Sequence, residues 1–231
     1  MKIHFALCAT ILFAALAGAQ AHALDLSGLS DKDAVAGLKE ALNKGSVAAV
    51  TALGRPDGFL GNARVRIPLP QGLQQLEAMM RGLGMGKYAD ELVTTMNRAA
   101  ESAVVEAKPL LVDAAKNMSV RDAKAILGGG EDAATQYFRR STSAQLTQKF
   151  LPIVARATQK LKLADKYNEF AGKGAKFGLV DAKDANLNDY VTRKALDGLF
   201  LMIADEERNI RRDPVGAASG IISKVFGAIG R

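Results

Sequence analysis

The chain has 231 residues, and 31 basic residues against 24 acidic ones give it a formal net charge of +7. It contains one cysteine, two histidines and no tryptophan, and Cys8, His4 and His22 all lie within the first 23 residues. Without those 23 residues, the remaining 208 exclude any mechanism or metal site that needs a histidine, a thiolate or a disulfide. That length still suffices to bury a stable core.

The first 23 residues have the pattern of a secretory signal peptide. Lys2 gives a charged start, residues 3–16 are almost wholly apolar, and Ala21-His22-Ala23 fits a small-x-small cleavage site. The apolar stretch of about 14 residues is short for a membrane anchor, the alternative, because a bilayer span needs roughly 20. We expect cleavage after Ala23, a periplasmic location and a mature chain with no transmembrane span.

The mature chain begins with a long helix and then a proline-containing segment. Ser30 and Asp33 form a capping box that opens a helix, and Gly54 ends it. Residues 62–71 alternate like a strand, but their two prolines confine them to a sheet edge or an extended loop. We therefore predict one extended, Pro-containing segment near residues 62–71.

Shorter helices are expected after this segment. A second capping box, Ser119 with Asp122, and a third, Thr142 with Gln145, mark two of their starts. The third box predicts a break after residue 138, followed by a helix that bends at Pro152. In chain order the expected helices are 73–83, 87–105, 109–118, 119–127, 131–138 and 142–161.

The last third of the chain contains its most apolar helix. Asn186 and Asp189 cap this helix, and Asp197 is the one charge between residues 195 and 204. Asp213-Pro214 begins the final segment. The pattern predicts an all-α fold, a compact bundle of about eight or nine helices in a single helical domain over residues 24–231.

Four separated blocks carry a resemblance to a known family. They are GRPDGFLGNARVRIPLP (54–70), LLVDAAKNMSVRDAKAIL (110–127), DAATQYFRRSTSAQLTQKFLP (132–152) and DYVTRKALDGLFLMIADEE (189–207). In this order they resemble the domain of unknown function 4197 family, over nearly the whole mature chain. The resemblance implies an exported, mostly helical protein of Gram-negative bacteria. It implies no activity, and no catalytic residue is carried over.

Two groups of basic residues are candidates for binding an anion or a partner: Arg64 and Arg66, and Arg139 and Arg140, which follow Tyr137. Arginine forks grip phosphate or carboxylate. The alternatives are that Arg64 and Arg66 form a solvated face that guards a strand edge, and that Arg139 and Arg140 offset the dipole at a helix C-terminus.

The C-terminal segment is a second candidate surface, for a membrane or a partner. It has no acid after Asp213 and carries Lys224. It either lies on an anionic membrane or docks on the bundle. Its apolar face comprises Ile221, Ile222, Val225, Phe226 and Ile229.

Other motifs are better explained by structure than by chemistry. The glycines of residues 82–87 indicate a helix–helix turn rather than a phosphate loop, and residues 184–189 indicate a helix cap rather than a calcium loop. Asp197 is expected to pair with a basic side chain or to lie at a helix edge, a buried general acid being the alternative. Glu101 is expected to form a solvated pair with Arg98. No metal or cofactor is predicted.

The leading functional hypothesis is a non-enzymatic periplasmic binding or adaptor protein of the cell envelope, because the commonest catalytic side chains are missing. Its partner would be an envelope protein, an anionic surface or an apolar ligand, and peripheral membrane contact stays open. Nucleic acid is disfavoured because acidic residues interrupt the basic ones and aromatic residues are few. One alternative is a hydrolase of an envelope polymer that uses carboxylates instead of histidine. The other is a carrier of an apolar small molecule or lipid, with a cavity lined by Met79, Met80, Leu146, Phe150, Leu199 and Phe200.

Overall fold

The computed structural model describes residues 30–84, 86–159, 162–176, 181–216 and 220–229, and the predicted signal peptide lies outside them. These residues contain no strand, so the predicted all-α fold is confirmed. A short 3-10 turn, η1 (Ala182–Asp184), precedes α8. The helices are α1 (Asp31–Gly54), α2 (Gln71–Gly82), α3 (Gly86–Val104), α4 (Ala107–Lys116), α5 (Val120–Leu127), α6 (Ala133–Thr158), α7 (Lys162–Lys176), α8 (Leu187–Arg212) and α9 (Gly220–Ile229).

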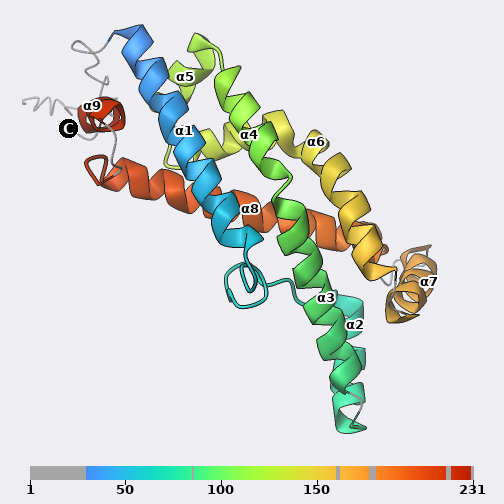
Figure 1. The fold of residues 1–231 in the computed structure, drawn as a ribbon. Coiled ribbons are helices and arrows are strands. Elements are labelled where there is room, and N and C mark those ends of the chain that lie inside the picture. The colour runs from blue at the N-terminus through green and yellow to red at the C-terminus, as the bar shows by residue number, and fades with distance from the viewer. Residues whose placement is uncertain (1–29, 85, 160–161, 177–180, 217–219, 230–231) are drawn as a thin grey trace, which may run out of the picture.

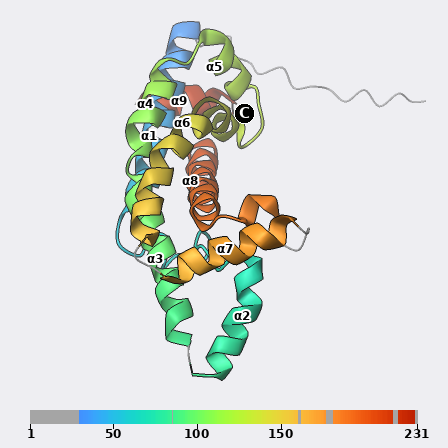
Figure 2. The ribbon, with the colours of Figure 1, turned by 90° about the vertical axis from the view of Figure 1, so that its right-hand side faces the viewer.

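Most of the helices form one layer that crosses α8 (Figure 1). Helices α3 and α4 follow one another along the middle of this layer, with α1 on one side and α6 on the other. Helix α8 packs against α1, α3 and α6, and α9 packs on α1. Helices α2 and α3 extend beyond this body, as the view in Figure 2 shows from a second side.

The centre of the fold is α8, as its apolar sequence predicts. Leu199, Phe200 and Ile203 are at most 3% exposed. The helix starts where expected, because the side chain of Asn186 accepts hydrogen bonds from the backbone N–H groups of Asn188 and Asp189. The caps predicted at Ser30 and Ser119 are also present.

Side chains of α3 and α8, instead of a neighbouring strand, bond to the backbone of the extended segment, and the Tyr190 hydroxyl donates to Pro68 O at 3.0 Å. Val65 and Ile67 are buried, whereas Arg64 and Arg66 are exposed, so the predicted alternation is confirmed. Asn97 of α3 accepts a hydrogen bond from Ile67 N at 2.8 Å and donates one to Ile67 O at 2.9 Å. This buried amide satisfies both backbone groups of Ile67, as a strand partner would.

The predicted break after residue 138 is wrong, because α6 runs without interruption from Ala133 to Thr158. Thr142 does not cap a helix, since its hydroxyl donates to Phe138 O, one turn earlier in the same helix. Buried residues recur every four positions from Phe138 through Leu146 to Val154. The helix continues through Pro152.

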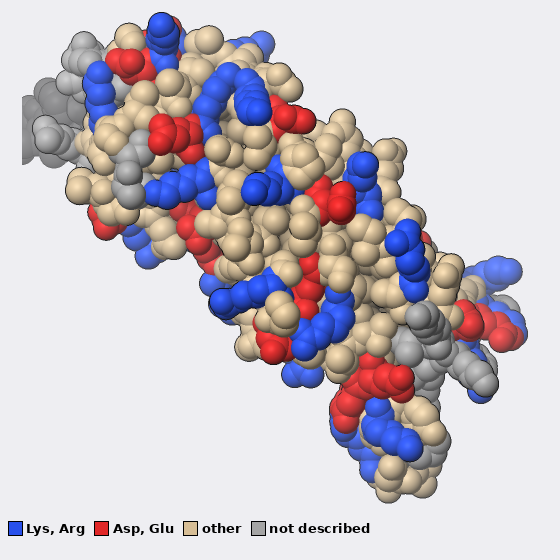
Figure 3. Space-filling view, in the orientation of Figure 1, with Lys and Arg blue, Asp and Glu red and all other residues tan. Residues whose placement is uncertain are grey.

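Basic and acidic side chains are interspersed over the face of the molecule drawn in Figure 3. Within the ranges that the structure describes, no helix combines the length and the apolarity needed to cross a membrane.

Two buried glycines on α1 allow a matched test of whether the close packing of α9 on α1 contributes to stability. A Cβ added at Gly37 would lie 2.5 Å from Val225 Cγ2 and 2.9 Å from Ile221 O, whereas one added at Gly45 would lie 3.4 Å from Glu206 Cβ, an ordinary contact. We expect Gly45→Ala to stabilise the protein by about 0.5–1 kcal/mol through helix propensity. Gly37→Ala should destabilise it by about 1–3 kcal/mol, because α9 has to move.

Urea unfolding followed by circular dichroism measures both free energies of unfolding. Equal effects of the two substitutions would show that the close approach of α1 and α9 does not contribute to stability.

Candidate functional site

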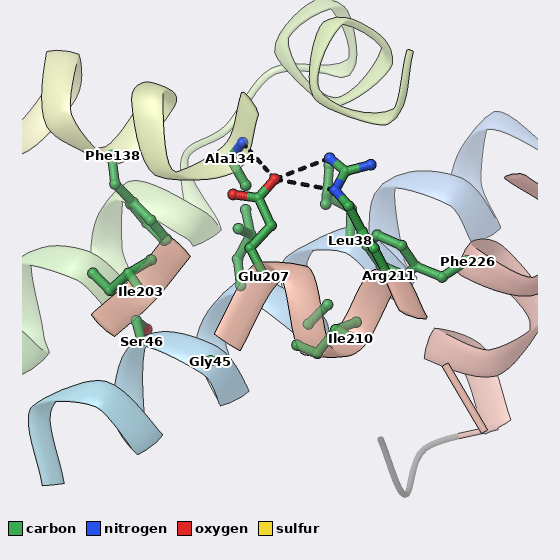
Figure 4. A pocket seen from close by; sticks show the side chains of 12 residues that line it. Leu38, Gly45, Ser46, Ala134, Phe138, Ile203, Glu207, Ile210, Arg211 and Phe226 are labelled. Carbon is green, nitrogen blue, oxygen red and sulfur yellow. Dashed lines mark hydrogen bonds and ion pairs between the residues drawn. The ribbon is translucent and has the colours of Figure 1, made fainter. Parts of the chain in front are cut away.

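A buried carboxylate at the start of α6 joins the two longest helices (Figure 4). Glu207 of α8 accepts hydrogen bonds from the N–H groups of Ala134 and Thr135, at 3.0 and 2.9 Å, and from the Thr135 hydroxyl at 2.9 Å. Arg211, one turn further along α8, donates to the same carboxylate from Nε and Nη2. The side chain of Asp132, the residue before the helix, makes no capping hydrogen bond. Glu207 therefore takes the place of a local N-cap.

A small cavity lies beside Glu207. It measures about 20 Å³, and its lining includes Leu38, Phe138, Ile203 and Phe226. That is room for about one water molecule. Because Ala134, Thr135 and Arg211 all donate to Glu207, its carboxylate acts here as an acceptor that holds the backbone and Arg211 in place.

Glu101 has a similar role, and its predicted exposure is wrong. The residue is 4% exposed, and its Oε1 accepts from the N–H groups of Phe59 and Leu60 at 3.0 and 3.1 Å. Arg98 does pair with it, at 2.7 Å from Oε2. The turn after α1 folds over α3 and brings two backbone donors to Glu101, and helical spacing alone gives no sign of this contact.

The predicted basic residues lie at two places along α8 instead of forming one site. Arg64 pairs with Asp205. Arg139 lies over the ring of Phe200, 4.6 Å from its centroid, and 3.4 Å from Asp197. The two carboxylates are eight residues apart on α8, about 12 Å along its axis. Asp197 pairs with Arg139, whereas Asp205 pairs with both Arg64 and Arg208. Asp197 thus pairs with a basic side chain, as expected, and is 49% exposed.

The other three candidates differ in their contacts. Arg66 is exposed, and its charge helps lower the pKa of Asp90, after the larger effect of Arg81. The Tyr137 hydroxyl donates to Ala114 O at 2.9 Å, and burial raises the pKa of this tyrosine. Arg140 is exposed and lines a surface hollow of about 250 Å³ together with Tyr137.

The apolar face of α9 packs on the bundle. Ile222, Val225 and Phe226 are at most 4% exposed, Ile221 is half-buried, and the side chain of Ile229 lies outside the described part of the structure. Lys224 pairs with Asp33 of α1 at 2.9 Å. In this conformation the three buried residues contribute to the core.

The projecting pair of helices, which we call the α2–α3 arm (residues 71–93), is a surface that the sequence analysis missed. Helix α2 packs mainly on α3, and the turn between them leaves Leu83 75% exposed and Tyr88 44% exposed. Gly84 in this turn has a φ of +73°, a conformation that glycine adopts without strain. The signal available in the sequence was the apolar residue between two glycines.

A polar hollow, which the sequence did not predict, lies between α1 and the end of α8, and we call it the α1–α8 hollow. It measures about 430 Å³, and Lys44, Glu206, Asn209, Arg212 and Asp213 are among its lining residues. No cluster of three or more carboxylate, histidine or cysteine side chains suited to a metal ion occurs among the residues described.

A family model described as "Protein of unknown function (DUF4197)" matches residues 28–227. The chain therefore belongs to this family, as the four sequence blocks predict. Searches among curated proteins and among solved structures gave no match.

The role of Glu101 can be tested by truncation. Glu101→Ala leaves two buried N–H groups without an acceptor, and we expect a loss of about 2–4 kcal/mol in the free energy of unfolding. The matched control is Glu91→Ala, which removes an exposed carboxylate from the same helix and should change stability by less than about 0.5 kcal/mol. A Glu101 variant as stable as the control would refute the structural role, and chemical denaturation provides the measurement.

Proposed function

We propose that the protein is a non-enzymatic binding or adaptor protein of the cell envelope, located in the periplasm, and that it contacts a partner protein through the tip of the α2–α3 arm. The observation that carries this proposal is the exposure of Leu83 and Tyr88 at the end of a projecting helical hairpin. Exposed apolar side chains surrounded by charged ones are typical of protein–protein contact surfaces.

Ion pairs keep the arm in shape without covering its tip. Arg81 of α2 pairs with Glu77 on its own helix and with Asp90 on α3. Lys87 lies 5.2 Å from the centre of the Tyr88 ring. An exposed tyrosine with few rotatable bonds supplies a large contact area at low cost in conformational entropy, so the arm presents a preformed surface.

The interior supports this proposal over a lipid carrier. Leu146, Phe150, Leu199 and Phe200, four of the residues expected to line a cavity, are at most 1% exposed. The side chains of Met79 and Met80 lie outside what the structure describes. The cavity beside Glu207, with its volume of about 20 Å³, is too small for a lipid tail.

The arrangement of carboxylates likewise favours binding over hydrolysis. Glu101 and Glu207 accept hydrogen bonds from backbone and arginine, and Asp197 pairs with Arg139. Each of these groups has a contact that accounts for it. An acid–base pair for glycosidic hydrolysis needs one carboxyl group that donates a proton.

Site-specific cross-linking tests the arm. With a photoreactive amino acid at position 83 or 88, we expect an adduct with one envelope protein, because these side chains are exposed at the end of the arm. The same amino acid at Gln148, an exposed position on α6, is the control. Competition by unlabelled protein should remove the adduct, whereas unlabelled Leu83→Asp/Tyr88→Asp protein should not compete. Adducts of equal yield at all three positions, or none at 83 and 88, would contradict the proposal.

Export is tested separately, by the mass and the location of the protein. We expect a periplasmic protein that begins at Leu24, and Ala23→Arg should block its maturation, because the cleavage site requires small residues. Intact mass spectrometry of fractionated cells distinguishes the two forms. A full-length chain that stays in the cytoplasm would refute the periplasmic assignment.

A further inference from the structure

The α1–α8 hollow is large enough for a small ligand. Its volume of about 430 Å³ falls within the range of about 300–1,000 Å³ found for ligand pockets. Ala48 and Lys44 border it from α1, and the last two turns of α8 border it from the other side. The C-terminal end of α8, which borders the hollow, lies at the α9 end of the molecule, away from the α2–α3 arm (Figure 1).

The polar residues at the end of α8 fall into two groups, those that form ion pairs and those that line the hollow. Asp205, Glu207, Arg208 and Arg211 all form ion pairs. Glu206, Asn209 and Arg212 lie three residues apart and therefore share one face, which lines the hollow. With respect to the other described residues, no hydrogen bond or ion pair engages these three side chains. This face of α8 presents an acid, an amide and a guanidinium in that order.

Of these three side chains, Glu206 is the one whose surroundings disfavour its charged form. Burial raises the pKa of its carboxyl group, and the neighbouring charge of Asp205 raises it further. A cationic group placed against Glu206 would relieve both effects. At the other end of the face, the Arg212 guanidinium suits a carboxylate.

We propose that the α1–α8 hollow binds a short peptide, with the peptide ammonium at Glu206 and its terminal carboxylate at Arg212. The two side chains are six residues apart on α8, a rise of about 9 Å along the helix axis. A two- or three-residue peptide in extended form spans about 7–10 Å. Asn209, halfway between them, both donates and accepts hydrogen bonds, as a peptide group requires.

This inference goes beyond the proposed function, because it assigns a second site that shares no residue with the arm. The two proposals can be refuted independently, since cross-linking at positions 83 and 88 does not involve the hollow. The acidic and basic residues that line it together suit a ligand carrying both charges, and a ligand with only one charge would leave the opposite set unsatisfied.

Calorimetric titration of the purified full mature chain tests the proposal. The probes are trialanine, N-acetyl-trialanine and trialanine amide, which share three alanine residues, and each of the last two has one terminal charge removed by a small blocking group. We expect trialanine to bind and each blocked peptide to bind at least about tenfold more weakly, since each loses one charge-assisted contact. Trialanine should be recovered intact.

Variants assign each peptide end to a residue. Glu206→Gln should remove the preference for a free amine while keeping that for a free carboxylate, and Arg212→Gln should do the reverse. Ala48→Leu should weaken binding by filling the hollow from α1. Glu91→Gln, Arg156→Gln and Ala144→Leu, all at exposed positions elsewhere, are the matched controls and should bind as the unchanged protein does.

Three results would overturn the proposal: no binding of trialanine at millimolar concentration, equal binding of the blocked peptides, or equal effects of the hollow variants and the controls. Release of alanine from trialanine would also overturn it, because the site would then be catalytic. Thermal melting of each variant shows whether the fold is retained, and the selective loss of one preference at a time distinguishes recognition from unfolding.

Discussion

The contact of Glu207 with the start of α6 is the constraint on which the rest of the bundle depends. It fixes the N-terminus of α6 against α8 through two backbone N–H groups, and Arg211 balances the charge. Because α6 and α8 are the longest helices and pack against each other, their relative position determines where α1 and α3 pack. Removing one member of such a buried group typically costs about 3–5 kcal/mol.

The same principle operates in two segments that lie outside the helices. Glu101 holds the turn after α1, and Asn97 holds the extended segment. In each case one polar side chain on a helix satisfies backbone groups that would otherwise be buried without partners. The fold thus fixes these irregular segments with carboxylate and amide groups.

Features set by neighbouring residues could be predicted from the sequence, and features set by distant ones could not. The caps at Ser30, Ser119 and Asn186 depend on residues two or three positions away, so their patterns are readable. The burial of Glu101 depends on Phe59, 42 residues distant. The capping-box pattern at Thr142 was misleading, because nothing local distinguishes a hydroxyl that caps a helix from one that bonds to the preceding turn. The α1–α8 hollow likewise appears only when two helices are brought together.

The polar side chains near the C-terminal end of α8 fall into two groups: some form ion pairs within the bundle, and others line the α1–α8 hollow. Glu207, Arg211, Asp205 and Arg208 form internal contacts. The neighbouring Glu206 has no such contact with the residues that the structure describes, and burial raises the pKa of its carboxyl group, so it adds nothing to stability through them. A glutamine or alanine at position 206 would avoid the desolvation that raises this pKa. Glu206, Asn209 and Arg212 instead keep a polar face open towards a hollow of ligand size. A bound group that carries the opposite charges would supply these side chains with the partners that the other described residues do not.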